Sequence, residues 1–133
     1  MSDWNTTIID EFRANEGKVG EFEGFSVMLI HHVGAKSGTE RVNPVVCYPQ
    51  SDSQFAIMAS KGGAATNPDW YYNLKAHPEV TVEFGTETFA VAVRELEGRE
   101  RETAWADALN PQLEEAQKKT TRKFPVLLLT RIL

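Results

Sequence analysis

Apolar and polar residues alternate along much of the chain, which predicts β-strands with one buried face. The alternation is cleanest at residues 80–84 and 89–93, and the turn Gly85-Thr-Glu between them predicts a β-hairpin. Runs rich in Val, Ile, Leu and Phe predict four more strands, at residues 25–33, 42–48, 54–59 and 125–132. Because Pro44 has no N–H group, the second of these four is expected to be broken or to lie at a sheet edge.

Two short segments show the spacing of amphipathic helices. The first covers residues 6–15 and is expected to end at Gly17. The second runs to Lys75, with Asn67 as the expected cap and Pro68 in the first helical position. These two helices would lie before the first strand and in the middle of the chain.

A third helical segment covers residues 100–117, and Pro111 is expected to kink or split it near Asn110. About six strands joined mostly by short turns predict a mainly antiparallel sheet that closes on itself, flanked by helices. The expected fold class is therefore α+β with a small β-barrel. A doubly wound parallel fold is disfavoured, because helices do not follow each strand. We expect one domain overall, with an N-terminal helical segment at residues 1–23 and the barrel at residues 24–133.

Composition narrows the possible functions. The 133 residues carry a net charge of −5, which disfavours general nucleic-acid binding. One cysteine, Cys47, excludes an internal disulfide or thiolate cluster, and three histidines leave little material for a metal site. Cys47 is expected in the core, and of His31 and His32 one ring should point inward and the other outward. Without an apolar run near ~20 residues or a signal sequence, we expect a cytoplasmic protein.

Two loops combine lysine with glycine, which suits the binding of an anion by backbone N–H groups. The first, residues 34–41, contains two glycines, Lys36, Arg41 and two hydroxyl side chains, and the second begins at Ser60. Both lie in residues 24–78, a segment that contains four basic and three acidic residues. The alternatives are an ordinary solvated hairpin turn and a flexible loop.

Three blocks, taken together, resemble a known family. They are Gly34-Ala-Lys-Ser-Gly-Thr-Glu-Arg-Val-Asn-Pro, Ala59-Ser-Lys-Gly-Gly-Ala and Asn67-Pro-Asp-Trp-Tyr-Tyr-Asn-Leu-Lys-Ala-His-Pro. In this order and spacing the chain is similar, from about residue 25 to residue 132, to the actinobacterial deazaflavin (coenzyme F420)-dependent nitroreductases and F420H2-dependent quinone reductases. The resemblance implies a split β-barrel related to flavin mononucleotide-binding barrels.

The resemblance also implies a site. The phosphate and acidic tail of F420 would lie on the first loop, the deazaflavin ring along the second strand, and the remaining wall would come from the other two blocks. The implied cofactor-binding residues are Ala35, Lys36, Ser37, Arg41, Val42, Asn43, Pro44, Val45, Val46, Met58, Ala59, Ser60, Lys61, Asp69, Trp70, Tyr71, Tyr72 and Asn73. Because hydride transfer mainly needs positioning, only Ser60 is a catalytic candidate, as proton donor.

One segment departs from the family. Members that reduce nitroimidazoles carry tyrosines after the long helix, whereas here Leu113 and Ala116 stand in their place. The expected function is hydride transfer from reduced F420 to a quinone-like or nitroaromatic acceptor, with nitroimidazoles disfavoured.

Two rival functions remain. One is a non-catalytic module that binds a deazaflavin, a flavin or a fatty-acid-like ligand, and the other is an oxidoreductase that uses flavin mononucleotide. The protein is expected to be a monomer or homodimer, and peripheral membrane contact stays open.

Overall fold

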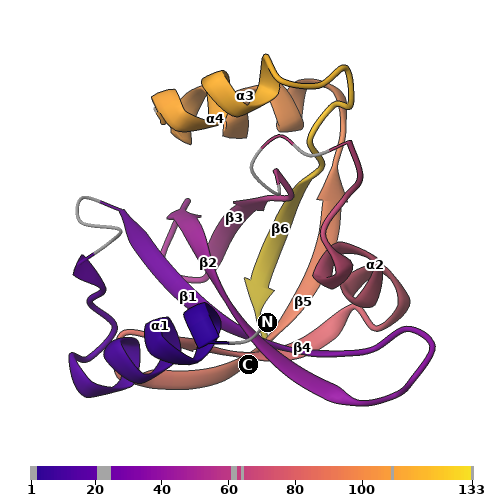
Figure 1. Cartoon of the computed structure of the whole chain (residues 1–133). Coiled ribbons are helices and arrows are strands. Elements are labelled where there is room, and N and C mark those ends of the chain that lie inside the picture. The colour runs from indigo at the N-terminus through magenta and orange to yellow at the C-terminus, as the bar shows by residue number, and fades with distance from the viewer. Residues whose placement is uncertain (1–2, 21–24, 61–62, 64, 109, 133) are drawn as a thin grey trace.

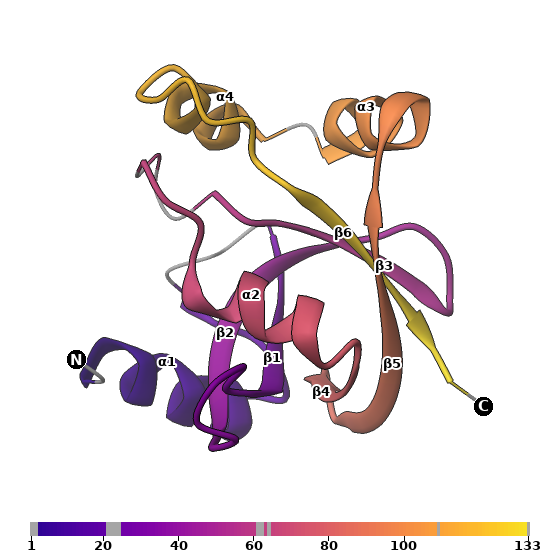
Figure 2. The same ribbon diagram turned by 90° about the vertical axis from the view of Figure 1, so that its right-hand side faces the viewer.

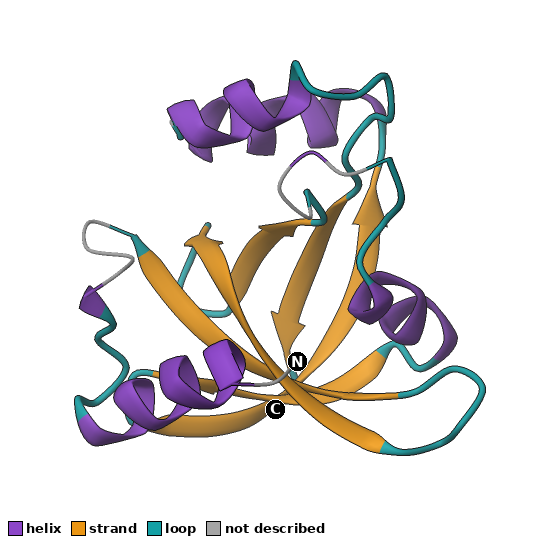
Figure 3. Cartoon of the chain, viewed as in Figure 1, coloured by secondary structure: helices purple, strands orange, loops and turns teal. Residues whose placement is uncertain are grey.

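A closed six-stranded barrel forms the centre of the computed structural model (Figures 1 and 3). The structure describes residues 3–20, 25–60, 63, 65–108 and 110–132. The strands are β1 (Ser26–Val33), β2 (Glu40–Pro49), β3 (Gln54–Met58), β4 (Glu79–Phe84), β5 (Glu87–Leu96) and β6 (Val126–Arg131). They follow the order β1-β2-β3-β6-β5-β4, and every neighbouring pair is antiparallel. The predicted fold class is confirmed.

Four helices flank the barrel on different sides (Figures 1 and 2). They are α1 (Asp3–Ala14), α2 (Asp69–Ala76), α3 (Gly98–Ala108) and α4 (Pro111–Gln117). α1 packs on the outer face of β1 and β2, and α3 and α4 lie together over one end of the barrel. None of the helices among the described residues combines the length and apolar character that crossing a bilayer requires.

Strand β1 is buried on both of its faces. Met28 and Ile30 point into the barrel, where they join a core that also includes Leu74 of α2. Leu29 points the other way and packs against Phe12 of α1. Because successive side chains of a strand point to opposite faces, a helix on the outside is what allows an almost continuous apolar run here.

The barrel is open along one part of β2. β2 pairs with β1 from Glu40 to Cys47, but it pairs with β3 only at Tyr48 and Pro49. Among the described residues, no strand therefore neighbours the rest of its outer edge. Pro44 lies in this unpaired stretch, where a missing N–H group costs no ladder hydrogen bond. The prediction that Pro44 marks a sheet edge is confirmed.

Helix starts differ from the sequence prediction in α1 and α2. Helix α1 begins at Asp3, three residues before the expected start at residue 6. Pro68, not Asn67, is the N-cap of α2, and the helix begins at Asp69. The Asn67 side chain instead accepts a hydrogen bond from Arg122. The split at Pro111 is confirmed, because Asn110 caps a separate helix by accepting from the Gln112 N–H at 3.0 Å.

The backbone after α1 packs closely against the β4–β5 turn, and this predicts that replacing Gly17 will destabilise the protein strongly. Gly17 has φ +94°, and a Cβ there would lie 2.8 Å from Gly85 Cα. Gly38 has φ +72° but open space around it. Gly38→Ala should cost about 1–2 kcal/mol of unfolding free energy through backbone strain alone. Gly17→Ala should cost about 1–3 kcal/mol more through overpacking. Urea denaturation checks this, and equal losses in the two variants would contradict it.

Candidate functional site

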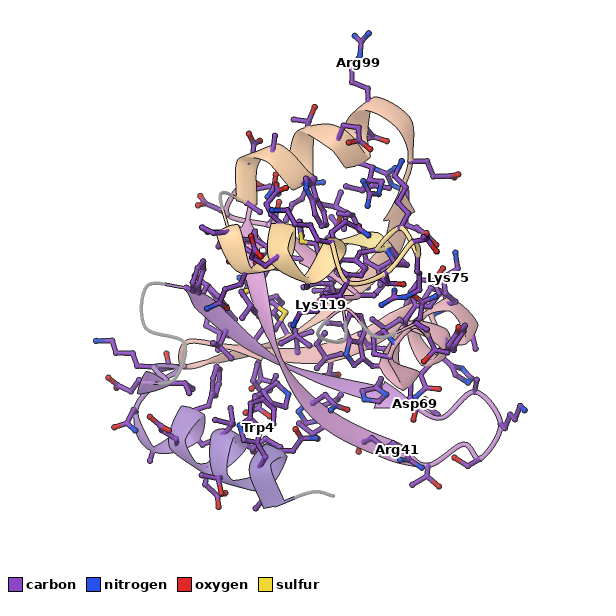
Figure 4. The ribbon with its side chains drawn as sticks, turned by 45° about the horizontal axis from the view of Figure 1, so that its top comes forward. Trp4, Arg41, Asp69, Lys75, Arg99 and Lys119 are labelled. Atoms are coloured by element: carbon purple, nitrogen blue, oxygen red, sulfur yellow. The ribbon has the colours of Figure 1, made fainter. Side chains whose placement is uncertain are left out.

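A cleft with a volume of about 970 Å³ lies where the barrel is open. Its walls come from the unpaired part of β2, the end of β3, the start of α2, the first turns of α4 and the N-terminal half of α1. Trp4, Arg41 and Asp69, labelled in Figure 4, line it from α1, β2 and α2 respectively. Elements distant in sequence thus meet at the gap in the barrel.

Most of the predicted site residues line this cleft. They are Arg41, Val42, Asn43, Pro44, Val45, Val46, Met58, Ser60, Asp69, Trp70, Leu113 and Ala116. Ala35, Lys36, Ser37, Ala59, Tyr71, Tyr72 and Asn73 are described residues outside its lining. Lys61 lies outside the described residues.

The unpaired edge of β2 gives the cleft a backbone wall. Because neither β3 nor another described strand pairs with Val42 to Val46 on that side, this edge is free to exchange hydrogen bonds with a ligand. Val42 and Val46 add apolar side chains on the same wall. A flat, partly polar ring system is the type of ligand that such a wall suits.

The N–H groups of Ala35 and Gly38 in the β1–β2 turn already have acceptors, one in α2 and one within the turn. The N–H of Ala35 donates to Asn73 Oδ1 at 2.8 Å, and that of Gly38 donates to the Gly34 carbonyl at 3.0 Å. The N–H groups of Lys36 and Ser37 have no acceptor among the described residues. Ala35 thus contributes to the shape of the turn, whereas Lys36 and Ser37 can still donate to an anion.

A buried histidine connects this turn to the cleft. Asn73 Oδ1 is occupied by Ala35, so its Nδ2 faces His32 Nδ1 at 2.9 Å and donates to it. His32 Nδ1 is therefore unprotonated, and His32 Nε2–H donates to Asn43 Oδ1 at 2.6 Å. The amide nitrogen of Asn43 remains as a donor at the cleft, since no described residue accepts from it.

Burial favours the neutral form of His32. Its side chain is 1% exposed, and burial lowers its pKa below the ordinary 6.5. The hydrogen bond with Asn43 opposes this shift, while Arg41 adds to it and Asp69 opposes it. The hydrogen bonds from Asn73 to His32 and from His32 to Asn43 require the neutral ring, because a protonated Nδ1 would face the donor side of the Asn73 amide.

Arg122 fixes the loop that follows β3. Its guanidinium donates to the carbonyls of Ala59 at 3.0 Å and Ser60 at 2.8 Å, and also to Asn67. Gly63, farther along the loop, approaches α4 so closely that a Cβ would lie 2.6 Å from a backbone oxygen of that helix. This glycine therefore has a packing role.

Tyr48 and Asn110 form a polar contact in the wall beside α4. Asn110 Nδ2 donates to Tyr48 Oη at 2.8 Å. Burial raises the pKa of Tyr48, and the hydrogen bond from Asn110 partly offsets that rise. The phenol is therefore neutral at pH 7.

Other candidate groups have roles away from the cleft. The Tyr71 hydroxyl donates to Glu95 at 2.8 Å, and burial together with Glu95 raises the pKa of Tyr71 to about 12. Tyr72 is half exposed. Burial also raises the pKa of Cys47 to about 12, which agrees with the predicted core residue and opposes a nucleophilic role. No group of three potential metal ligands occurs among the described residues.

Sequence reasoning missed several residues of this site. Trp4, Asn5, Thr6, Ile9, His32, Tyr48, Pro68, Asn110 and Gln112 line the cleft, and Arg122 supports its loop. The sequence did hint at His32, because one of the two adjacent histidine rings in this apolar strand was expected to point inward. Nothing in the sequence distinguished Arg122, which lies in a charged stretch like many solvated arginines.

A family model and a relative of known sequence carry the same description. A family model described as F420H(2)-dependent quinone reductase matches residues 4–131. A protein of Mycobacterium tuberculosis (strain ATCC 25618 / H37Rv), named an F420H(2)-dependent quinone reductase, is 31% identical over 128 residues. That alignment covers 90% of this chain and 85% of the relative.

Solved structures resemble the chain as well. A structure of an F420-H2 dependent reductase (FDR-A) has a TM-score of 0.70 and 40% identity, covering 77% of this chain and 92% of the other. A structure described as a domain-swapped dimer has a TM-score of 0.72 and 34% identity, covering 96% and 98%. The Vibrio cholerae protein HutZ, at 14% identity and a TM-score of 0.57, covers 94% of this chain and 88% of its own, and shares the fold.

The buried His32 predicts a loss of stability in mild acid. Its folded pKa lies below 6.5, so the unfolded chain binds the proton more readily, and stability should fall as pH drops through 6.5. Each unit of that difference is worth about 1.4 kcal/mol. His32→Gln should reduce the loss seen by urea denaturation between pH 7.5 and 5.5, while the exposed-site control His77→Gln should keep it. An unchanged loss in His32→Gln would refute this assignment.

Proposed function

The chain belongs to the family of F420H(2)-dependent quinone reductases, and on this premise we propose that reduced coenzyme F420 binds in the cleft and supplies a hydride to a quinone. The observation that carries the proposal is the unpaired edge of β2 along the cleft. A deazaflavin ring has polar edges and flat apolar faces. The free backbone groups and the valines of this strand suit both.

Charge around the β1–β2 turn supports binding of the anionic part of the cofactor. Arg41 lines the cleft, and Lys36 lies in the adjoining turn beside the two available N–H groups. Phosphate and carboxylate groups favour such a combination of fixed N–H donors and cations. In this proposal the turn holds the phosphate and the acidic tail, so that the ring lies along β2.

The acceptor would lie on the α4 side of the cleft. Leu113 and Ala116 give that side two apolar side chains. An apolar wall accommodates the flat ring of a quinone. Nitroimidazoles are proposed as poorer acceptors, because Leu113 and Ala116 stand where the family resemblance leads us to expect tyrosines, while other nitroaromatic compounds stay alternative acceptors.

Ser60 remains a candidate proton donor in this proposal. It lines the cleft, and Arg122 fixes its carbonyl. The assembly as monomer or homodimer, the cytoplasmic location and the peripheral membrane contact stay predictions.

Fluorescence titration tests the proposed cofactor directly. Trp4 and Trp70 line the cleft, so a ligand there should quench their emission. F420 is expected to bind more tightly than flavin mononucleotide, and anaerobic mixing of F420H2, protein and menadione should oxidise the cofactor. Absence of F420 binding would overturn the proposal. Binding without oxidation of F420H2 by any quinone or nitroaromatic compound would identify a non-catalytic module instead.

Removing the turn lysine should weaken F420 binding. Lys36→Ala removes a cation that we assign to the phosphate or tail, and we expect affinity to fall roughly tenfold, as for one lost charged contact. The effect should shrink in high salt. The matched control is Lys123→Ala, because Lys123 is exposed and pairs with Glu102 of α3. Equal affinities of the two variants would exclude Lys36 from the anion site.

A further inference from the structure

We propose that Tyr48 is the proton donor to the acceptor: its phenol hydrogen-bonds to a quinone oxygen and transfers its proton as the hydride arrives. This inference rests on the proposed function and names a catalytic residue for it. Tyr48 lies at the end of β2 where the strand begins to pair with β3, and it lines the cleft. Its ring packs against the cluster that contains Leu113, one of the two residues expected at the acceptor.

The direction of one hydrogen bond leaves the phenol hydrogen available. Asn110 Oδ1 accepts from the Gln112 N–H at 3.0 Å, which caps α4 and fixes the orientation of the amide. Asn110 Nδ2 therefore faces Tyr48 and donates to its oxygen at 2.8 Å. Because this bond uses a lone pair of the oxygen and not its hydrogen, the Tyr48 O–H remains available to donate to a further partner. No described residue accepts from it, so the partner would be a molecule in the cleft.

The reaction balances with this donor. Reduction of a quinone to a hydroquinone needs two electrons and two protons. The hydride supplies both electrons and one of the protons. Charge then develops on an acceptor oxygen, the Tyr48 O–H bond breaks, and a new O–H bond forms on that oxygen. Water returns a proton to the phenolate, matched by the proton that oxidation of F420H2 releases. The hydrogen bond from Asn110 stabilises the phenolate between these steps.

Tyr48 suits this role better than Ser60. A phenol is a far stronger acid than an aliphatic hydroxyl, so it can give up a proton to a developing oxyanion. Burial raises the pKa of Tyr48, so the phenol is protonated at neutral pH and has a proton to give. It is also placed in the wall next to Leu113, on the side where an apolar acceptor fits.

Two variants test the proposal in the full-length protein. Tyr48→Phe should lower kcat with menadione at least about tenfold, because general acid catalysis typically contributes that much or more. Its affinity for F420 should remain that of the wild type. Thr103→Val is the control for loss of a hydroxyl away from the cleft, since Thr103 is exposed on α3 and outside the cleft lining, and it should change neither quantity. Wild-type kcat in Tyr48→Phe, or a larger loss in Ser60→Ala, would overturn the assignment.

The second variant separates proton donation from packing. Asn110→Asp keeps a good helix cap, but the new carboxylate accepts the phenol hydrogen and turns it away from the cleft. We expect an unchanged unfolding midpoint with a lower kcat. A merely structural Tyr48 would leave kcat unchanged in this variant.

A measurement without cofactor keeps the test independent of the proposed function. Menadione should quench the tryptophans of the apoprotein, and Tyr48→Phe and Asn110→Asp should each weaken its binding about two- to tenfold through one lost hydrogen bond. If the wild type oxidises F420H2 with no quinone or nitroaromatic compound, the proposed function falls, while the menadione affinities still show whether Tyr48 contacts the quinone. Equal menadione affinity in the wild type and Tyr48→Phe would overturn the contact with Tyr48.

Discussion

The unpaired outer edge of β2 is the constraint on which the rest of the structure depends. A barrel of six strands can close while one strand keeps most of an edge free, because β2 pairs with β1 along its length and with β3 only at Tyr48 and Pro49. An exposed edge is ordinarily a liability, since its backbone groups can pair with another chain. Here helices and loops surround it, and the gap becomes a cleft instead of an aggregation site.

Hydrogen bonds behind the cleft fix the orientation of several side chains and loops that form its wall. His32 is a buried neutral ring that connects Asn43 at the cleft with Asn73, and Asn73 in turn holds the β1–β2 turn. On the other side, Arg122 holds two carbonyls of the loop after β3. Buried polar groups with satisfied partners have well-defined orientations, so Asn73 and Arg122, which lie outside the lining, hold the lining in position from behind.

The fold could be predicted well from the sequence because its signals are local. Alternation gave the strands, and the turn at Gly85 gave a hairpin between β4 and β5. Pro44 indicated a sheet edge, and Pro111 indicated the break between α3 and α4. The predicted starts of α1 and α2 were wrong. Helix α1 begins three residues earlier than expected, at Asp3. The cap of α2 depended on Arg122, whose guanidinium takes the Asn67 side chain away from the helix.

What the sequence by itself determined is therefore the set of elements, the family and most of the cleft lining, since these residues follow one another along β2 or recur in contiguous motifs. The tertiary structure alone decided which side chains meet across the cleft. Tyr48 and Asn110 are 62 positions apart, as are Arg122 and Ser60, and His32 and Asn73 are 41 apart. Such contacts have no local period to reveal them, because they exist only once the barrel has closed and α4 lies over its end.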